Sequence, residues 1–210
     1  ADSYNQTRNY PKKTFETDLD YQMMRMRARV LTSSTIPAEI DFLKSKLDTD
    51  DSLIRTVHEY GLVLALTQEL NFDQAHGIIS RLRQQFPHNI PVRIAEAEIH
   101  EHAQQADEAI ELLQQALEVN TGNYPLTVNL GEAYLAGRKP HAALGVLIPV
   151  SVNRPNDEYV WYLLAEAYGL ANNIPGVHEA RAEFFVLNGN FDQAIKQLGY
   201  ALPLVRHNFQ

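Results

Sequence analysis

Apolar residues recur every three to four positions in short segments that come in pairs, which is the spacing of one face of an α-helix. In the stretch 129–155, Leu130 and Tyr134 fall on one face of a first helix. Ala143 and Leu147 fall on one face of a second helix. A glycine and a proline lie between the two faces, and both residue types interrupt helices. The pattern therefore predicts two consecutive helices joined by a short turn.

The same pair of helices recurs at a constant spacing without insertion. Its four copies begin near Thr56, Ile90, Tyr124 and Glu158. One small position is occupied by Ala75, Ala109 and Ala143, and one large apolar position by Ile79, Leu113 and Leu147. A fixed period of about 34 residues indicates a repeat protein in which each repeat buries its apolar face against its neighbours.

The repeat resembles the tetratricopeptide repeat (TPR) family over most of the chain. Leu130, Gly131 and Tyr134 match the Leu-Gly-x-x-Tyr of the family, and Ala143 matches its later alanine. The resemblance implies an all-α fold, a right-handed superhelix (α-solenoid) of antiparallel helix pairs with a period of about 34 residues. In the second copy Glu96 replaces the usual leucine, which predicts a more exposed first helix there.

The last repeat is offset by half a period. The tetrapeptide Phe-Asp-Gln-Ala occurs at 72–75 and again at 191–194, where it lies half a period out of step with the fourth copy. We therefore expect the helix over about 176–187 to be the second helix of one pair and the first of the next. The predicted segments are a flexible arm or linker (1–17), a leading degenerate helix pair (18–55), the regular repeats (56–175) and the half-step repeat (176–210).

The leading helix is predicted from Asp18 onward and is rich in methionine. Met23, Met24 and Met26 are all of the methionine in the chain. Met23, Met26 and Val30 recur at helical spacing, which predicts that they face inward. Clustered methionine makes an adaptable binding face. The other interpretation is a helix that caps the first repeat by packing on it.

Composition limits the classes of partner. The chain has 210 residues and a formal net charge of −8, and its segment 1–30 holds six basic and four acidic side chains. The acidic remainder excludes nucleic acid as a partner, because phosphate attraction dominates such binding. No apolar run is long enough to span a membrane, so we expect no direct membrane insertion.

The chain has no Cys, which excludes disulfides and fits an oxidising compartment. It opens Ala-Asp-Ser without an apolar leader, as a piece of a longer protein would.

No catalytic or metal-binding arrangement is found, so we expect no catalytic residue, metal ligand or cofactor in this chain. His58 and Glu59 match the start of a His-Glu-x-x-His zinc motif, but the second His is absent. His100 and His102 are two apart on a predicted helix, so their side chains point about 200° apart and do not share one ion. Neither a phosphate-binding Gly-rich loop nor a G-x-S-x-G motif occurs.

In a TPR superhelix the first helix of each pair lines the concave face, and two rows of residues fall on it at the repeat period. One row is apolar or aromatic and consists of Tyr60, Ile94, Val128 and Tyr162. The other consists of Leu64 and three carboxylates, Glu98, Glu132 and Glu166. The predicted binding set also contains Gln68, His102, Leu135 and Leu170. Such a groove suits an extended polypeptide or a helix. The alternative interpretation is that the three glutamates are solvated residues that favour helix formation and have no binding role.

A closer resemblance rests on the order of the elements. The helix DYQMMRMRARVL precedes the repeats, NLGEAYLAGRKPHAAL lies in the middle, and the half-step repeat RAEFFVLNGNFDQAIKQL follows. This order is similar to the C-terminal TPR region of the periplasmic HtpX-like zinc metallopeptidases, the beta-barrel assembly-enhancing protease group.

This second resemblance implies a zinc endopeptidase domain in the parent protein, so zinc is expected there and not in this chain. It also implies a periplasmic location and a chaperone-like role in outer-membrane protein assembly and quality control. The implied partners are outer-membrane protein substrates, the assembly machinery and the protein's own protease domain. The alternative is a free-standing TPR adaptor without any protease domain.

Overall fold

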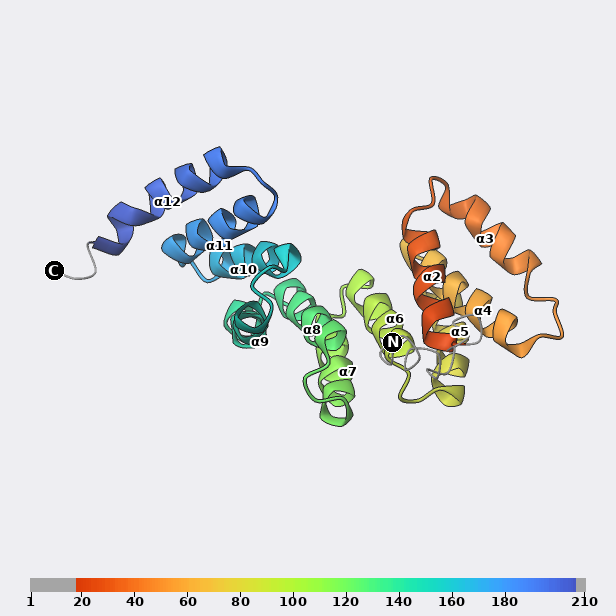
Figure 1. Cartoon of the computed structure of the whole chain (residues 1–210). Helices are drawn as coiled ribbons and strands as arrows, with labels where there is room; N and C mark the ends of the chain where they lie inside the picture. Colours follow the sequence, from red (N-terminus) through yellow and green to blue (C-terminus); the bar gives the residue numbers. More distant parts are fainter. Residues whose placement is uncertain (1–17, 207–210) are drawn as a thin grey trace, which may run out of the picture. The chain divides into compact units, whose positions relative to one another are not determined.

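The computed structural model describes residues 18–206, and every regular element in that range is an α-helix (Figure 1). The helices are α2 (Leu19–Leu31), α3 (Ile36–Ser45), α4 (Ser52–Gln68), α5 (Phe72–Gln85), α6 (Ile90–His102), α7 (Ala106–Val119), α8 (Tyr124–Ala136), α9 (Pro140–Asn153), α10 (Glu158–Leu170), α11 (Ile174–Leu187) and α12 (Phe191–Arg206). The predicted all-α class, an α-solenoid of helix pairs, is confirmed. The predicted arm over residues 1–17 lies outside the described residues.

The chain divides into two compact units between Ala95 and Glu96, within α6. In the first unit α2 and α3 contact α4, and α4 contacts α5. In the second unit each helix from α7 to α12 contacts the next, and α8 also contacts α10. The finer division into a leading pair, regular repeats and a half-step repeat remains a prediction.

The repeat period is visible in the turns between paired helices. The second helices α5, α7, α9 and α11 begin at residues 72, 106, 140 and 174. Two residues before each start lies a residue with positive φ: Leu70, Gln104, Arg138 and Asn172. The amide of the following residue donates to the carbonyl five residues earlier at 2.8–2.9 Å, which is the Schellman arrangement of a helix C-terminus. Each pair is therefore joined by the same three-residue turn.

The same turn occurs once more, half a period later. Gly189 has a φ of 71°, and the amide of Asn190 donates to the carbonyl of Phe185 at 2.8 Å. α11 begins at residue 174 and α12 at residue 191, which is half the spacing between the earlier starts. α11 contacts both α10 and α12, as the half-step prediction expects, and the assignment of 176–210 as a half-step repeat stays a prediction.

Asp and Asn side chains fix where helices begin. The residues Asn71, Asn123, Asp157 and Asn173 each accept a hydrogen bond from the amide three residues on, at 3.1–3.4 Å. These bonds satisfy amides that have no partner within the helix. α4 begins four residues ahead of the repeat register, at Ser52 instead of Thr56. The cause is Asp51, whose Oδ1 accepts from the amides of Leu53 and Ile54 at 2.9 and 3.0 Å.

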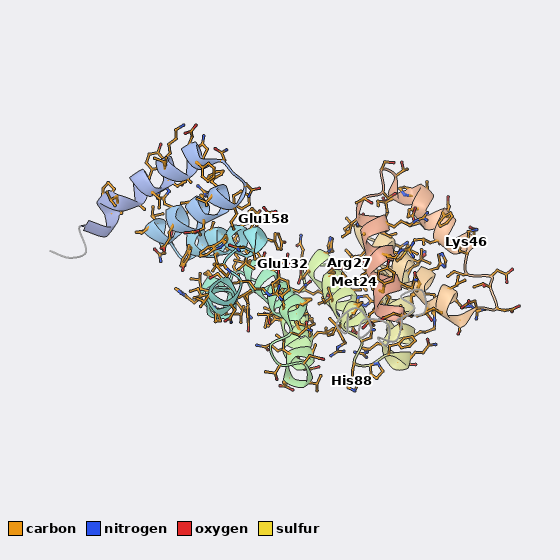
Figure 2. All side chains as sticks on the ribbon, in the orientation of Figure 1. Met24, Arg27, Lys46, His88, Glu132 and Glu158 are labelled. Atoms are coloured by element: carbon orange, nitrogen blue, oxygen red, sulfur yellow. The ribbon has the colours of Figure 1, made fainter. Side chains whose placement is uncertain are left out.

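Two of the three methionines in α2 are core residues. Met23 and Met26 are buried, whereas Met24, which is labelled on α2 in Figure 2, is exposed. A Cβ on Gly61 of α4 would lie only 2.6 Å from Met26 Cγ. Because Gly61 has no side chain, α2 packs closely on α4 at this position. α2 therefore caps the first repeat by packing on it, and its inward methionines fill the space between the helices.

The predicted exposure of the first helix of the second copy is wrong at Glu96. Only 7% of the surface of Glu96 is exposed. The alanines on either side, Ala95 and Ala97, are buried as well, and adjacent residues of a helix point in different directions. This part of α6 is therefore enclosed on more than one face, which the residue type at a single position does not reveal.

The core of the second unit is built around Leu147 of α9. Leu147 and Ala143 are buried together with Leu135 of α8 and Leu164 of α10. A Cβ on Gly131 of α8 would lie 2.7 Å from Leu147 Cδ2 and 2.9 Å from its Cγ. α8 and α9 therefore approach this closely only because position 131 carries no side chain.

Gly131→Ala is expected to destabilise the chain by about 1–3 kcal/mol, the usual cost of overpacking a buried site. Gly145 of α9 is the matched control, because a Cβ there would meet nothing within 4 Å. Gly145→Ala is expected to stabilise by about 0.5–1 kcal/mol, since it replaces an exposed helical glycine. Urea unfolding followed by far-UV circular dichroism measures both changes. Two changes of the same sign would contradict the close contact at Gly131.

Candidate functional site

The structure divides the predicted binding set into buried and accessible residues. The buried members are Tyr60, Leu64, Ile94, Val128 and Leu135. The accessible members, half-buried or exposed, are Gln68, Glu98, His102, Glu132, Tyr162, Glu166 and Leu170. Of the predicted apolar row, Tyr162 alone is exposed. A binding role for these residues remains a prediction, and burial narrows it to the accessible group.

In the second unit Glu132 of α8 meets Tyr159 of α10. The Tyr159 hydroxyl donates a short hydrogen bond to Glu132 Oε1. Burial, followed by this bond, raises the pKa of Tyr159 well above its ordinary value. The hydroxyl therefore stays protonated and continues to donate at neutral pH. Figure 2 shows the Glu132 side chain on α8.

Aromatic rings continue from Tyr159 along α10 and onto α11. The rings of Tyr159 and Tyr162 are stacked, with centroids 6.1 Å apart and planes 13° apart. The ring of Phe184 lies 6.3 Å from Tyr162 and 5.7 Å from Phe185. Tyr159 is 44% exposed and Tyr162 50%, so the row is open to solvent. Exposed aromatic groups with a polar end are typical of interaction surfaces.

The aromatic row ends in a surface hollow between α10 and α11. Its volume is about 350 Å³, and its lining residues are Tyr162, Ala165, Glu166, Arg181, Phe184 and Phe185. Glu166 and Arg181 add one acidic and one basic group to an otherwise apolar lining. Apolar walls with a few polar groups are the usual form of a binding pocket.

Glu101 of α6 lies close to the carboxylates of Glu98 and Glu132. Its Oε1 is buried and has no hydrogen-bond partner among the described residues. Burial raises the pKa of Glu101 to about 8, and the charges of Glu132 and Glu98 add to this effect. Glu101 is therefore neutral in most molecules at pH 7.

Tyr124 holds the beginnings of α8 and α10 together. Its hydroxyl donates to Asp157 Oδ2 at 2.5 Å, and the Arg154 guanidinium lies 4.2 Å from the centroid of its ring. Burial, together with the bond to Asp157, raises the pKa of Tyr124 to about 12. Asp157 also caps α10, so this contact helps to position Tyr159 against α8.

Sequence reasoning missed Tyr159, Glu101 and Phe184. Tyr159 lies three residues before Tyr162, and Glu101 lies three residues after Glu98. Residues three apart share a helix face, so the helical spacing contained the signal for both. Phe184 lies on α11, which the half-step pattern makes the first helix of a further pair, and the two predicted rows were not extended to that helix.

Metal-ligand clusters and long apolar helices are both absent from residues 18–206. No group of three or more His, Asp and Glu side chains in that range is placed to hold a metal ion. His100 Nδ1 lies 2.9 Å from Gln105 Oε1, and His102 Nδ1 lies 2.9 Å from the carbonyl of Glu98, so the two rings have separate partners. Among the helices that the structure describes, none combines the length and the apolar character that a membrane span requires.

Comparison with protein families gives a direct match over the repeats. The family model of the tetratricopeptide repeat matches residues 66–120 and 102–167. The chain carries tetratricopeptide repeats. The TPR assignment made from the Leu-Gly-x-x-Tyr spacing is therefore confirmed.

The TPR chain is also similar to curated proteases. It is 33% identical over 148 residues to the beta-barrel assembly-enhancing protease of Escherichia coli strain K12, covering 70% of the chain and 30% of that protein. It is 29% identical over 202 residues to the protein of this name from Yersinia pestis, covering 96% and 41%. It is 30% identical over 207 residues to a putative beta-barrel assembly-enhancing protease of Vibrio cholerae, covering 98% and 43%. The chain thus spans less than half the length of these relatives, and the predicted resemblance to this group is confirmed.

Glu101→Gln is expected to make the TPR chain more stable at high pH. The raised pKa means that the folded chain keeps a proton that the unfolded chain releases, so stability falls as pH rises from about 4.5 towards 8. Each pH unit in that window lowers the free energy of unfolding by at most about 1.4 kcal/mol. Glutamine is a neutral isostere and removes this loss.

Urea midpoints near pH 5 and pH 8.5 measure the effect, with the exposed Glu108→Gln as the control. The gain from Glu101→Gln is expected at the higher pH and not at the lower. The same pH dependence in the native chain and in Glu101→Gln would show that Glu101 is not buried as described.

Proposed function

We propose that this chain is the polypeptide-binding part of a periplasmic zinc endopeptidase with a chaperone-like role in outer-membrane protein assembly and quality control. The observation that carries the proposal is the similarity of almost the whole chain to beta-barrel assembly-enhancing proteases. In this assignment the TPR chain supplies binding, and the rest of the parent protein supplies the zinc site and the peptide-bond chemistry.

The accessible surface of the second unit supports a binding role. Glu98, Glu132 and Glu166 offer negative charge, and the half-exposed rings of Tyr159 and Tyr162 offer apolar area. Stacked helix pairs present long surfaces that take up extended segments or helices. We assign as partners segments of outer-membrane proteins or of their assembly machinery, together with the parent's own protease domain.

A free-standing TPR adaptor is the second candidate. The observation that favours it is the family match, which covers only the repeats and carries no protease chemistry. The adaptor would use the same surface for binding, so surface variants of this chain do not separate the two candidates. The two candidates are separated by measurements on the full gene product.

The full gene product is expected to contain stoichiometric zinc and to cleave casein. Removal of residues 1–210 is expected to change the rate of casein cleavage and leave the zinc content unchanged, because the zinc ligands lie in another part of the parent. Metal analysis and a gel-based cleavage assay measure both quantities. A full-length product with neither zinc nor cleavage would contradict the protease assignment and favour the adaptor.

Reversal of the three surface carboxylates, Glu98→Lys with Glu132→Lys and Glu166→Lys, is expected to weaken polypeptide binding by roughly tenfold or more. The ligand is reduced and alkylated ribonuclease A, an unfolded basic polypeptide. Fluorescence anisotropy measures binding, and far-UV circular dichroism checks that helicity is kept.

The matched control reverses three exposed glutamates of α7, Glu108, Glu111 and Glu118, and so makes the same change in net charge. The control is expected to bind within about twofold of the native chain. Equal losses in the two triple variants would mean that net charge alone governs binding and that this surface is not the site.

A further inference from the structure

The second unit places an aromatic hollow next to a carboxylate on a neighbouring helix, and this juxtaposition defines a class of ligand. The hollow is lined by Tyr162, Phe184 and Phe185, with Glu166 and Arg181. The neighbouring carboxylate is Glu132. The inference that follows rests on the proposed polypeptide-binding function and specifies which polypeptides the surface takes.

Tyr159 joins the two parts of this surface. Its hydroxyl donates to the Glu132 carboxylate, while its ring stacks on Tyr162 at 6.1 Å. The contact is held in place because Tyr124 and Asp157 fix α10 against α8. A ligand side chain that covers the Tyr159 ring therefore also lies beside the Glu132 carboxylate.

Charge identifies the side chain that fits over Tyr159. Residues 96–210 contain fourteen acidic and six basic residues, whereas residues 1–95 contain twelve of each, so the net charge of −8 lies in the second unit. A Lys or Arg over the face of a tyrosine gains cation–π attraction, and a nearby carboxylate adds a charge-assisted hydrogen bond. An acidic side chain at the same place would be repelled.

Ring geometry identifies the second side chain. The hollow continues the row Tyr162, Phe184 and Phe185, with ring separations of 6.3 and 5.7 Å. Aromatic pairs at such distances are favourable beyond the area that they bury. An aromatic side chain of the ligand extends this row, and a charged side chain would lose its hydration against three rings.

We propose that this surface recognises an extended polypeptide segment whose aromatic side chain enters the hollow while a nearby Lys or Arg lies over Tyr159 beside Glu132. The two ring-to-ring steps from Tyr159 to Phe184 are 6.1 and 6.3 Å. The ring centroids of Tyr159 and Phe184 are therefore at most about 12 Å apart. At about 3.3 Å per residue about four residues of extended chain span this distance, and a spacing of four puts both side chains on the same face of the chain. The recognised feature is a basic and an aromatic residue with that spacing.

The test uses the intact 210-residue chain and twelve-residue peptides in a Gly/Ser background. The pair peptide carries one Lys and one Phe four residues apart, in either order, so that both side chains lie on one face of the extended chain. The comparison peptides replace Phe by Ala or Lys by Glu. Amide shifts in ¹H–¹⁵N NMR titrations give both affinity and location. The pair peptide is expected to bind roughly fivefold or more tightly than each comparison peptide, with the largest shifts on α10 and α11.

Variants of the chain assign the subsites. Phe184→Ala is expected to weaken binding of the pair peptide roughly fivefold or more. Tyr162→Ser, at a more exposed position, is expected to weaken it by a similar factor. Glu132→Gln is expected to remove most of the preference for Lys over Glu. Phe191→Ala, which removes an exposed ring of α12, is the matched control and is expected to leave the affinity within about twofold.

Three results would overturn the proposal: equal binding of pair and comparison peptides, tolerance of both Phe184→Ala and Tyr162→Ser, or shifts confined to other helices. A concentration-dependent dimer that Phe184→Ala abolishes would also overturn it, because a second copy would then cover the face. If unfolded ribonuclease A still binds while the pair peptide does not, the ligand assignment fails alone. If neither ligand binds, the proposed binding function fails with it.

Discussion

The left-handed residue in each turn is the constraint on which the rest of the chain depends. It satisfies the last carbonyls of the first helix through the Schellman bonds and reverses the chain within three residues. Leu70, Gln104, Arg138 and Asn172 adopt this conformation although they carry side chains, at a cost of about 1–2 kcal/mol each. A turn of constant length gives every pair the same register, and so brings Leu147 opposite Gly131.

Register also decides which side chains remain available to a partner. In the first three copies the apolar row, Tyr60, Ile94 and Val128, is used in packing. In the fourth copy the corresponding Tyr162 stacks on Tyr159 and contacts Phe184, yet half of its surface stays open. The most accessible part of the predicted groove therefore lies at α10 and α11, where Glu166 and Arg181 line the hollow and Glu132 of α8 adds a further carboxylate beside Tyr159.

Sequence periodicity predicted the helices and turns well because it reports the face of a helix on which a residue falls. The starts of α7, α9 and α11 and the half-step start of α12 all follow from spacing. Periodicity does not report how completely neighbouring elements cover a face, so the burial of Tyr60 and Glu96 was not foreseen. The bond from Tyr159 to Glu132 joins positions whose separation is not a multiple of the repeat, so repeat alignment did not pair them.

Helix contacts in both units join elements that are one or two places apart in the chain, such as α8 with α9 and α10. Contacts of short sequence separation require little loop closure, so such chains fold fast for their size. They also make stability a sum over neighbouring interfaces. One consequence is local opening: a helix at the end of a unit can detach without the loss of the others, and a binding surface beside such a helix can reshape around its ligand.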